Sequence, residues 1–335
     1  MKAVIFDAPG KIRIGEIDTP QLKPEEALIA VKASGLCGTD LHIYDGDFIA
    51  SYPVVPGHEF AGEVIDVGSD VVTVQVGDKV AVDPSIYCNR CKFCRENKQN
   101  FCENYRGYGI HYNGGFEEFV AIHQRNLYPI KGLSYLEGAM VEPVACGIHG
   151  MKQIELQLGE HVLIFGCGPI GLILMQLCQM GGAATVTMVD VQESKLELAE
   201  KLGATNSLLA DDNLKQRLCQ SQPDGFHVVI DATGNPRVVE RMFDYVRDKG
   251  RILFFGVCPA DAKIQISPYD VYKRELKICG TFALLHTARQ AVDVIKSKKI
   301  DVQSLVSHQF PLEDFEAAFA LKQQGKDAMK IMIIP

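Results

Sequence analysis

The chain has 335 residues, and at ~150 residues per domain this length predicts about two domains. Acidic residues outnumber basic ones by 42 to 34, and the resulting net charge of −8 argues against nucleic acid or an anionic membrane as a partner. With 47% hydrophobic and 23% charged residues, the composition is that of a globular protein and excludes intrinsic disorder.

The amino terminus lacks the apolar stretch of a signal peptide, and the richest apolar window, 170–180, is too short to span a bilayer. We therefore expect a soluble, cytoplasmic protein. Disulfides are rare in that compartment, so the 11 cysteines are expected to be metal ligands, catalytic groups or small core residues.

The first part of the chain, up to about residue 145, contains short apolar or alternating runs such as 27–31 and 64–67. Turns with glycine and proline separate these runs. This pattern predicts a mostly-β domain built from short strands.

From about residue 160 the pattern alternates between strand and helix. The expected strands are 161–165, 185–189, 228–230, 252–255 and 276–279, and the expected helices are 169–180, 193–202 and 237–246. Nearly continuous apolar strands that alternate with helices indicate a parallel sheet covered on both faces, and thus an α/β fold class.

The tail contains an expected helix over 288–296, an extended stretch over 305–312, a helix over 313–323 and a strand over 330–334. A six-stranded dinucleotide-binding sheet would already be complete before this tail. We therefore expect the tail to complete the first domain, so that one domain comprises 1–145 with 285–335 and the other 146–284.

A glycine-rich turn follows the first strand of the alternating region. The segment 166–171 matches the dinucleotide-binding fingerprint, and its expected cofactor-binding residues are Gly166, Gly168, Pro169, Ile170 and Gly171. The first glycine permits a tight turn, the second lets the backbone approach a pyrophosphate, and the third allows close packing of helix against strand. Free N–H groups at the helix start would bind the pyrophosphate.

Asp190 closes the next expected strand, where a carboxylate accepts hydrogen bonds from the adenosine ribose and repels a 2′-phosphate. We therefore expect NAD rather than NADP as the cofactor. Lys195 could reach the same ribose, or it could be a solvated helix lysine.

Four cysteines form the motif C-x2-C-x2-C-x7-C, namely Cys88, Cys91, Cys94 and Cys102. Four thiolates on one short loop suit a closed, structural zinc site. An iron–sulfur cluster is the rival interpretation, but the bacterial ferredoxin motif has a shorter last spacing that is followed by proline.

A second group of metal-ligand residues is dispersed along the chain: Cys37, the pair His58 and Glu59, and Glu142. A cysteine, a histidine and a carboxylate can hold a catalytic zinc with one position open for substrate. Spacing alone does not bring these residues together, since Cys37 could equally be a buried thiol and His58–Glu59 a turn pair.

The sequence resembles the zinc-dependent medium-chain alcohol dehydrogenases, and in particular their polyol (sorbitol-like) branch. The segment G-H-E-x2-G-x5-G-x2-V, beginning at Gly57, matches that family's zinc signature, and the cysteine loop, the glycine fingerprint and the domain order agree with it. The resemblance covers essentially the whole chain. It implies a GroES-like catalytic domain and a doubly wound Rossmann domain.

The resemblance also implies roles for individual residues. Cys37 and His58 would bind a catalytic zinc, with either Glu59 or Glu142 as the third ligand. Asp40 would orient His58. Thr39 and His42 would relay the proton of the alcohol to water. Further cofactor contacts are expected from Gly256, Val257 and Phe282. Two zinc ions per chain, NAD and a homodimer or homotetramer complete this expectation.

The expected reaction is hydride transfer between NAD and a secondary alcohol of a small polyol or sugar alcohol, or its phosphate, to give the ketose. Sorbitol dehydrogenases proper carry an arginine–tyrosine pair where this chain has Ala283 and Leu284, which argues against sorbitol itself. L-threonine 3-dehydrogenase and 2,3-butanediol-type dehydrogenase activities fit the same ligands. A non-catalytic relative would have lost ligand or relay residues, and this chain retains them.

Overall fold

The fold is that of a computed structural model of the chain, in which residues 1–325 and 328–335 are described. The chain divides into two compact units. The first comprises Met1–Ala145 and Leu284–Pro335, and the second comprises Cys146–Ala283. Leu284 therefore lies in the first unit, one residue from the boundary expected from sequence.

The first unit is built mainly of strands. These are β1 (Lys2–Ala8), β2 (Lys11–Glu16), β3 (Glu26–Leu36), β4 (Glu59–Val67), β5 (Lys79–Val82), β6 (Ser85–Ile86), β7 (Arg106–Gly107), β8 (Phe119–His123), β9 (Leu127–Pro129), β16 (Val306–Pro311) and β17 (Lys330–Ile334). Its helices are α1 (Gly38–Asp45), α2 (Lys92–Arg95), α3 (Tyr135–Ala139), α10 (Ala288–Lys296) and α11 (Phe315–Gln324), with 3-10 turns at Gln99–Phe101, Gln124–Asn126, Gln303–Leu305 and Leu312–Asp314.

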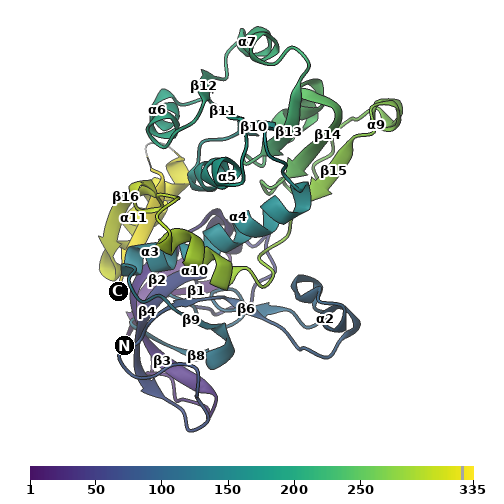
Figure 1. The fold of residues 1–335 in the computed structure, drawn as a ribbon. Helices are drawn as coiled ribbons and strands as arrows, with labels where there is room; N and C mark the ends of the chain where they lie inside the picture. The colour runs from purple at the N-terminus through teal and green to yellow at the C-terminus, as the bar shows by residue number, and fades with distance from the viewer. Residues whose placement is uncertain (326–327) are drawn as a thin grey trace. The chain divides into compact units, whose positions relative to one another are not determined.

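The carboxyl-terminal strands complete the main sheet of this unit. The seven-stranded sheet has the order β16-β17-β3-β4-β5-β9, with β8 also paired to β3. Strand β17 runs antiparallel to β3, with Met332 opposite Gly35. In Figure 1 the yellow carboxyl-terminal strands accordingly lie beside the purple amino-terminal ones.

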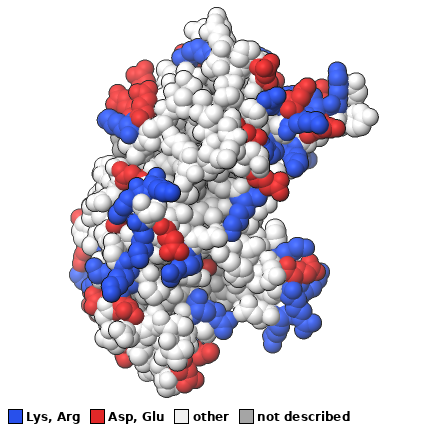
Figure 2. Space-filling view, viewed as in Figure 1, with Lys and Arg blue, Asp and Glu red and all other residues white. Residues whose placement is uncertain are grey.

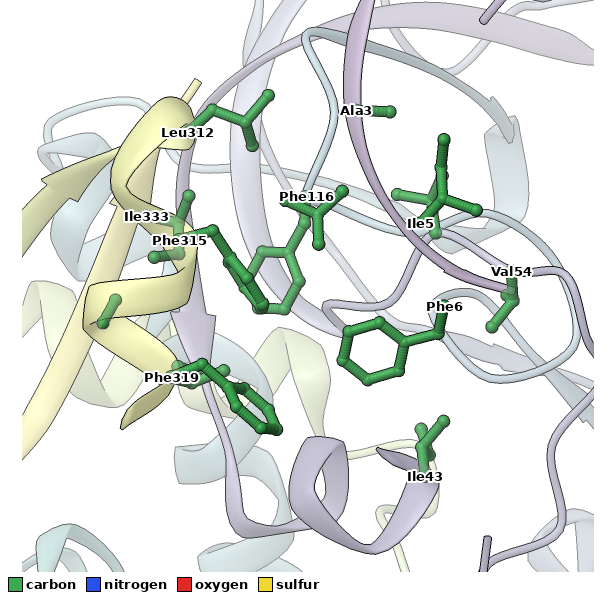
Figure 3. Packing of buried hydrophobic residues seen from close by; sticks show 14 of the residues in the cluster. Ala3, Ile5, Phe6, Ile43, Val54, Phe116, Leu312, Phe315, Phe319 and Ile333 are labelled. Carbon is green, nitrogen blue, oxygen red and sulfur yellow. The ribbon is translucent and has the colours of Figure 1, made fainter. Parts of the chain in front are cut away.

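An aromatic core fixes helix α1 on this unit. Phe6 meets Phe319 of α11 edge-on, with ring centroids 5.9 Å apart, and Phe116 packs on Phe315 at 5.0 Å (Figure 3). Ile43 of α1 is fully buried in the same cluster. Because burying such a side chain contributes about 1.5–3 kcal/mol, this contact fixes the helix that carries the expected relay residues.

The second unit contains the alternating strands and helices. Its strands are β10 (His161–Phe165), β11 (Thr185–Asp190), β12 (Asn206–Leu209), β13 (Phe226–Asp231), β14 (Val246–Phe254) and β15 (Lys277–Gly280). Its helices are α5 (Pro169–Met180), α6 (Glu193–Lys201), α7 (Leu214–Ser221), α8 (Pro236–Arg241) and α9 (Pro268–Lys273), with a 3-10 turn at Met242–Asp244. Helix α4 (Val141–Ile154) includes the boundary between the units in sequence.

All neighbouring strands of the second unit are parallel, in the order β12-β11-β10-β13-β14-β15. This is the doubly wound order, in which ligands bind at the carboxyl ends of the strands where the order reverses. The predicted fold class is therefore confirmed. The strand β12 and the helices α4, α7 and α9 were not expected from sequence.

A predicted helix and the strand after it, expected over 252–255, were wrong in extent. The helix expected over 237–246 ends at Arg241, and Val246 already belongs to strand β14. Val246 pairs with Phe226, and the register then shifts before Arg251 pairs with Val228. Backbone N–H and C=O groups that are not bonded within a helix need other partners. Pairing with β13 supplies such partners from Val246 onward, and the strand is therefore longer than expected.

Candidate metal and cofactor sites

Cys37 lies at the junction between strand β3 and helix α1. It is the N-cap residue of the helix, and its N–H donates a hydrogen bond to Oδ2 of Asp40 at 2.8 Å. Asp40 is fully buried in the first turn of the helix, where a carboxylate is favoured by the helix dipole. The backbone at Cys37 and the carboxylate of Asp40 are thereby held in a fixed relation.

His58 and Glu59 approach Cys37 from the start of strand β4. The ligand atoms of Cys37, His58 and Glu59 all lie within 4.8 Å of one another. His58 Nδ1 faces Asp40 Oδ1 at 3.6 Å, and neither atom has a hydrogen-bond partner in the described part of the chain. Since Nδ1 faces Asp40, the other ring nitrogen is available to a metal ion.

The three donors fit a catalytic zinc site. One thiolate, one imidazole and one carboxylate are ligands that zinc accepts, and three protein ligands leave a fourth position for substrate. A small movement of the imidazole towards Asp40 would complete the hydrogen bond that commonly orients a metal-binding histidine. Glu142, the alternative third ligand, is half-buried near the start of α4 and is not part of this group of three.

A buried lysine, Lys330, forms an ion pair with Glu59. The side chains are 4% and 2% exposed, and Lys330 Nζ donates to Glu59 Oε2. Gly35, on the strand between them, leaves room for this pair, because a Cβ there would lie 2.4 Å from Glu59 Oε2. Sequence analysis missed Lys330, since no spacing motif connects it to Glu59.

The charges of this group are mutually dependent. Burial opposes a charge on His58, but the Cys37 thiolate and Asp40 raise the pKa of His58 well above its usual value. Burial likewise opposes ionisation of Glu59, but the Lys330 ammonium outweighs it, and the pKa of Glu59 is lowered. Burial and the charge of Lys330 together lower the pKa of a second nearby lysine, Lys322. The negative charges of Glu59, Cys37 and Asp40 are therefore offset within this group by Lys330 and His58.

The expected relay residues lie on α1. The Thr39 hydroxyl oxygen is 3.6 Å from the Cys37 sulfur. His42 Nδ1 is 3.1 Å from Asp47 Oδ1, and its side chain is 41% exposed. Thr39 thus lies beside a candidate metal ligand, and His42 has access to solvent.

The four-cysteine loop forms a second candidate metal site. The sulfur atoms of Cys88, Cys91, Cys94 and Cys102 lie within 4.8 Å of one another. The N–H of Cys88 donates to Cys102 Sγ at 3.3 Å, and backbone N–H groups of Arg90 and Cys91 lower the pKa of Cys88 to about 6. These backbone N–H groups favour the thiolate form of the cysteine, and thiolates are the ligands of a closed tetrahedral zinc site.

Figure 2 shows acidic and basic side chains together on the lobe around α2. Lys98 pairs with Glu96 at 2.8 Å, and Lys92 with Glu103 at 3.7 Å. Both pairs are exposed, and exposed pairs contribute about 0–1 kcal/mol each. These surface ion pairs therefore contribute little to the stability of this lobe.

The glycine turn of the second unit has the geometry that its sequence predicts. Gly166 adopts φ +100°, which favours glycine, and a Cβ at Gly171 would lie 1.8 Å from the carbonyl oxygen of Gly166. Gly168 is the N-cap of α5, and a Cβ there would meet no atom within 4 Å. Pro169 occupies the first turn, where its lack of an N–H costs nothing. Ile170 follows it on the same turn.

Asp190 ends strand β11 beside this turn. Its Oδ2 accepts a hydrogen bond from the N–H of Cys167 at 2.7 Å, and its Oδ1 accepts one from the N–H of Gln192 at 3.0 Å. The carboxylate therefore also supports the turn itself, a role that its sequence position did not reveal. Carboxylate oxygens have further lone pairs, which remain able to accept from ribose hydroxyls.

The remaining expected cofactor residues vary in exposure. Lys195 is half-buried on α6, while Val257 and Phe282 are 69% and 44% exposed. Gly256 packs tightly, since a Cβ there would lie 2.2 Å from the backbone nitrogen of Gly234. Asp231, which sequence analysis missed, fixes this region by accepting a hydrogen bond from the Thr233 hydroxyl at 2.6 Å.

Comparisons with known proteins identify the family. The description "Alcohol dehydrogenase GroES-like domain" matches residues 23–132, and "Zinc-binding dehydrogenase" matches residues 169–297. A D-altritol 5-dehydrogenase from Agrobacterium fabrum is 38% identical over 99% of this chain and 98% of its own. A D-arabinitol dehydrogenase from Uromyces fabae is 34% identical over 100% of this chain and 97% of its own.

Among solved structures, a zinc-binding dehydrogenase from Sinorhizobium meliloti bound to NADP has a TM-score of 0.93 and 33% identity, covering 100% of this chain and 99% of its own. The chain therefore belongs to the zinc-dependent medium-chain alcohol dehydrogenase family. The resemblance seen in the sequence is confirmed. Among the described residues, no helix is long and apolar enough to cross a membrane.

Proposed function

We propose that this dehydrogenase transfers a hydride between NAD and a secondary alcohol of a small polyol or sugar alcohol, giving the ketose. The observation that carries the proposal is the group formed by Cys37, His58 and Glu59, in which His58 faces the carboxylate of Asp40. The names of the relatives, which are dehydrogenases of altritol and arabinitol, support the substrate class. The unit of Met1–Ala145 and Leu284–Pro335 would hold the zinc, and Cys146–Ala283 would bind NAD.

Cys37, His58 and Glu59 would hold the catalytic zinc. When bound, zinc polarises the oxygen of an alcohol and lowers its pKa. We assign Glu59 rather than Glu142 as the third ligand because its carboxylate lies with the other two ligand atoms. Asp40 would fix the imidazole of His58, and Lys330 would fix the carboxylate of Glu59.

Thr39 and His42 would carry the alcohol proton outwards. The Thr39 hydroxyl lies beside Cys37 and can accept a proton from a substrate hydroxyl while donating its own. His42 would pass the proton to water, since its side chain is exposed and its Nδ1 is held by Asp47. No contact between Thr39 and His42 is needed if the cofactor ribose lies between them, as the family resemblance implies.

Asp190 would select NAD. A carboxylate at the end of the second strand accepts hydrogen bonds from the ribose hydroxyls and repels a 2′-phosphate. The NADP-bound relative shows that the family also accommodates the phosphorylated cofactor. The selection in this chain would therefore depend on Asp190, with Lys195 as a secondary contact. The turn at Gly166 and Gly168 would receive the pyrophosphate.

We further propose a structural zinc at Cys88, Cys91, Cys94 and Cys102, and a homo-oligomer in a reducing cytoplasm. No disulfide forms among the described residues, as is usual for proteins of that compartment. Apolar and aromatic side chains along the edge strand β15 and helix α9 support oligomerisation: Ile278 is 39%, Tyr269 64% and Tyr272 79% exposed.

An initial-rate screen tests the proposed reaction. Formation of NADH would be measured with tetritols, pentitols, hexitols, their phosphates, 2,3-butanediol and L-threonine. We expect the highest kcat/KM with an unphosphorylated polyol, and a lower value when NADP replaces NAD. L-Threonine as the best substrate would replace the polyol assignment while leaving the zinc and cofactor assignments in place.

A further inference from the structure

The first unit contains a cavity that the proposed reaction does not use. It has a volume of about 510 Å³ and lies between the segment before β3, the residues around Tyr108–Glu117 and the start of β8. Known small-molecule sites measure about 300–1,000 Å³, so this cavity has the size of a binding site. Cys37, His58 and Glu59 do not line it.

A buried carboxyl group, Glu117, faces this cavity. Glu117 is 1% exposed, and Asn113 Nδ2 donates to its Oε2 at 3.2 Å. Burial raises the pKa of Glu117 to about 8. At neutral pH the group is therefore protonated and can both donate and accept a hydrogen bond.

Aromatic residues form another part of the cavity wall. The rings of Tyr108 and Tyr112 lie 6.4 Å apart at 51°, and Tyr112 is 53% exposed. The Tyr108 hydroxyl accepts a hydrogen bond from the N–H of His123 at 3.1 Å, which leaves its own proton for another acceptor. A phenol, an amide and a carboxylic acid beside aromatic rings suit hydroxyl groups on an apolar carbon skeleton.

Charged residues also line the cavity, namely Asp18, Lys23, Glu25, Glu26, Arg125 and the amino-terminal Met1. His123 Nε2 lies 3.3 Å from Glu25 Oε2, and Lys23 Nζ lies 3.0 Å from Glu26 Oε1. Carboxyl, amide and phenol groups together suit the hydroxyl groups of a neutral ligand, because a hydroxyl group can both donate and accept a hydrogen bond.

The wall that carries Glu117 is held in place before any ligand binds. The N–H groups of Gly115 and Phe116 donate to the carbonyls of Gly57 and Pro56 at 2.7 and 3.1 Å. Asn113 Oδ1 accepts a hydrogen bond from the N–H of Val55 at 3.3 Å. Binding therefore requires little ordering of the backbone, which favours affinity.

From this geometry we propose that the cavity is a second, non-catalytic binding site for a neutral, hydroxyl-rich molecule such as a sugar alcohol or a monosaccharide. Glu117 and Asn113 bind its hydroxyl groups, and Tyr108 and Tyr112 contact its carbon skeleton. The inference concerns binding alone and stands independently of which alcohol the enzyme oxidises.

Calorimetric titration of the zinc-loaded enzyme without NAD tests this proposal. The probes are ribitol, D-arabinitol, galactitol and D-glucose. We expect at least one probe to bind, with about tenfold weaker binding in Glu117→Leu because a buried hydrogen-bonding group is lost. Binding should stay within about threefold of wild type in Glu117→Gln and in the matched control Glu118→Gln, whose carboxylate instead accepts from the Lys2 N–H.

Tyr112→Ala, at an exposed position, gives a second variant should Glu117→Leu fail to fold, and we expect it to bind about tenfold more weakly. Hydrogen exchange locates the probe: protection should rise in residues 105–126 of the wild type, and this rise should be lost in Tyr112→Ala. The absence of heat with all four probes, or wild-type binding in both Glu117→Leu and Tyr112→Ala, would overturn the proposal. Failure of the NADH screen would leave this result untouched, since no turnover is measured.

Discussion

Lys330, at the start of the last strand, forms a buried ion pair with Glu59, at the start of β4. The two side chains are 4% and 2% exposed and lie 271 residues apart in the chain. Gly35, between them on β3, has no side chain to occupy their space. The carboxyl-terminal segment thus contributes directly to the candidate zinc site, and its return to the first unit has a functional consequence.

The substitution Lys330→Gln should destabilise the protein markedly. Removing one partner leaves the Glu59 charge buried without compensation, which costs about 3–5 kcal/mol. Lys215→Gln is the matched control, because Lys215 pairs with Asp244 at 3.3 Å with both side chains about half exposed. Its expected cost is below about 1 kcal/mol. Urea unfolding after removal of zinc measures both values, because bound zinc would itself compensate the charge of Glu59. Equal costs would show that the buried pair does not stabilise the protein more than the exposed one.

Asp190→Asn should change the choice of cofactor. The amide keeps the size of the side chain but loses the negative charge that repels a 2′-phosphate. We expect the KM for NAD to rise about tenfold and the KM for NADP to fall, with kcat changed little. Lys195→Met serves as a comparison that leaves the carboxylate in place. Initial rates with both cofactors decide the matter, and an unchanged ratio of kcat/KM values would refute the ribose role of Asp190.

His42→Gln should slow turnover in a pH-dependent manner. Near neutral pH the relay needs a group that takes the proton from the ribose, and we expect kcat to fall about tenfold. Above pH 9 hydroxide can take the proton directly, so the deficit should shrink. Asp47→Asn, which removes the partner of His42 Nδ1, should give a smaller effect of the same kind. A deficit that is constant from pH 6.5 to 9.5 would argue that the proton leaves by another route.

Glu117→Gln should alter the pH dependence of stability. Burial raises the pKa of Glu117 from 4.5 to about 8 in the folded chain. The native acid therefore contributes stability that is fully present below about pH 4.5 and is lost as the pH rises through about 8. Glutamine does not ionise, so the variant should gain on wild type by about 1.4 kcal/mol per pH unit in this window.

Unfolding free energies at pH 5 and pH 7.5 measure this gain, with Glu118→Gln as the control at the neighbouring, partly exposed position. The same difference between variant and wild type at both pH values would mean that Glu117 is ionised in the folded protein.

Much of the second unit could be predicted from its sequence because its signals are local. The helix Pro169–Met180 and the strand His161–Phe165 have the predicted bounds, since proline and glycine mark their ends. The strand Asn206–Leu209 has no fully buried residue, and its apolar signal is correspondingly weak. The end of the helix that begins at Pro236 depends on strand pairing by Val246, which no local pattern reveals.

Only part of the candidate zinc site could be predicted from the sequence. Cys37 and His58 were found through motifs, but their proximity depends on the pairing of β3 with β4. Whether Glu59 or Glu142 is the third zinc ligand depends on where their side chains lie. The spacing of these residues in the sequence does not predict this. Lys330 has no motif at all, because ion pairs between distant strands leave no periodic signal.

The most direct test of this account counts zinc in wild type and in Cys37→Ala, together with NADH formation from the best polyol. We predict two zinc ions per chain in wild type and one in the variant, which should stay folded through the four-cysteine site and lose activity. A variant that retains two zinc ions, or that oxidises the polyol at the wild-type rate with one, would contradict a catalytic zinc held by Cys37, His58 and Glu59.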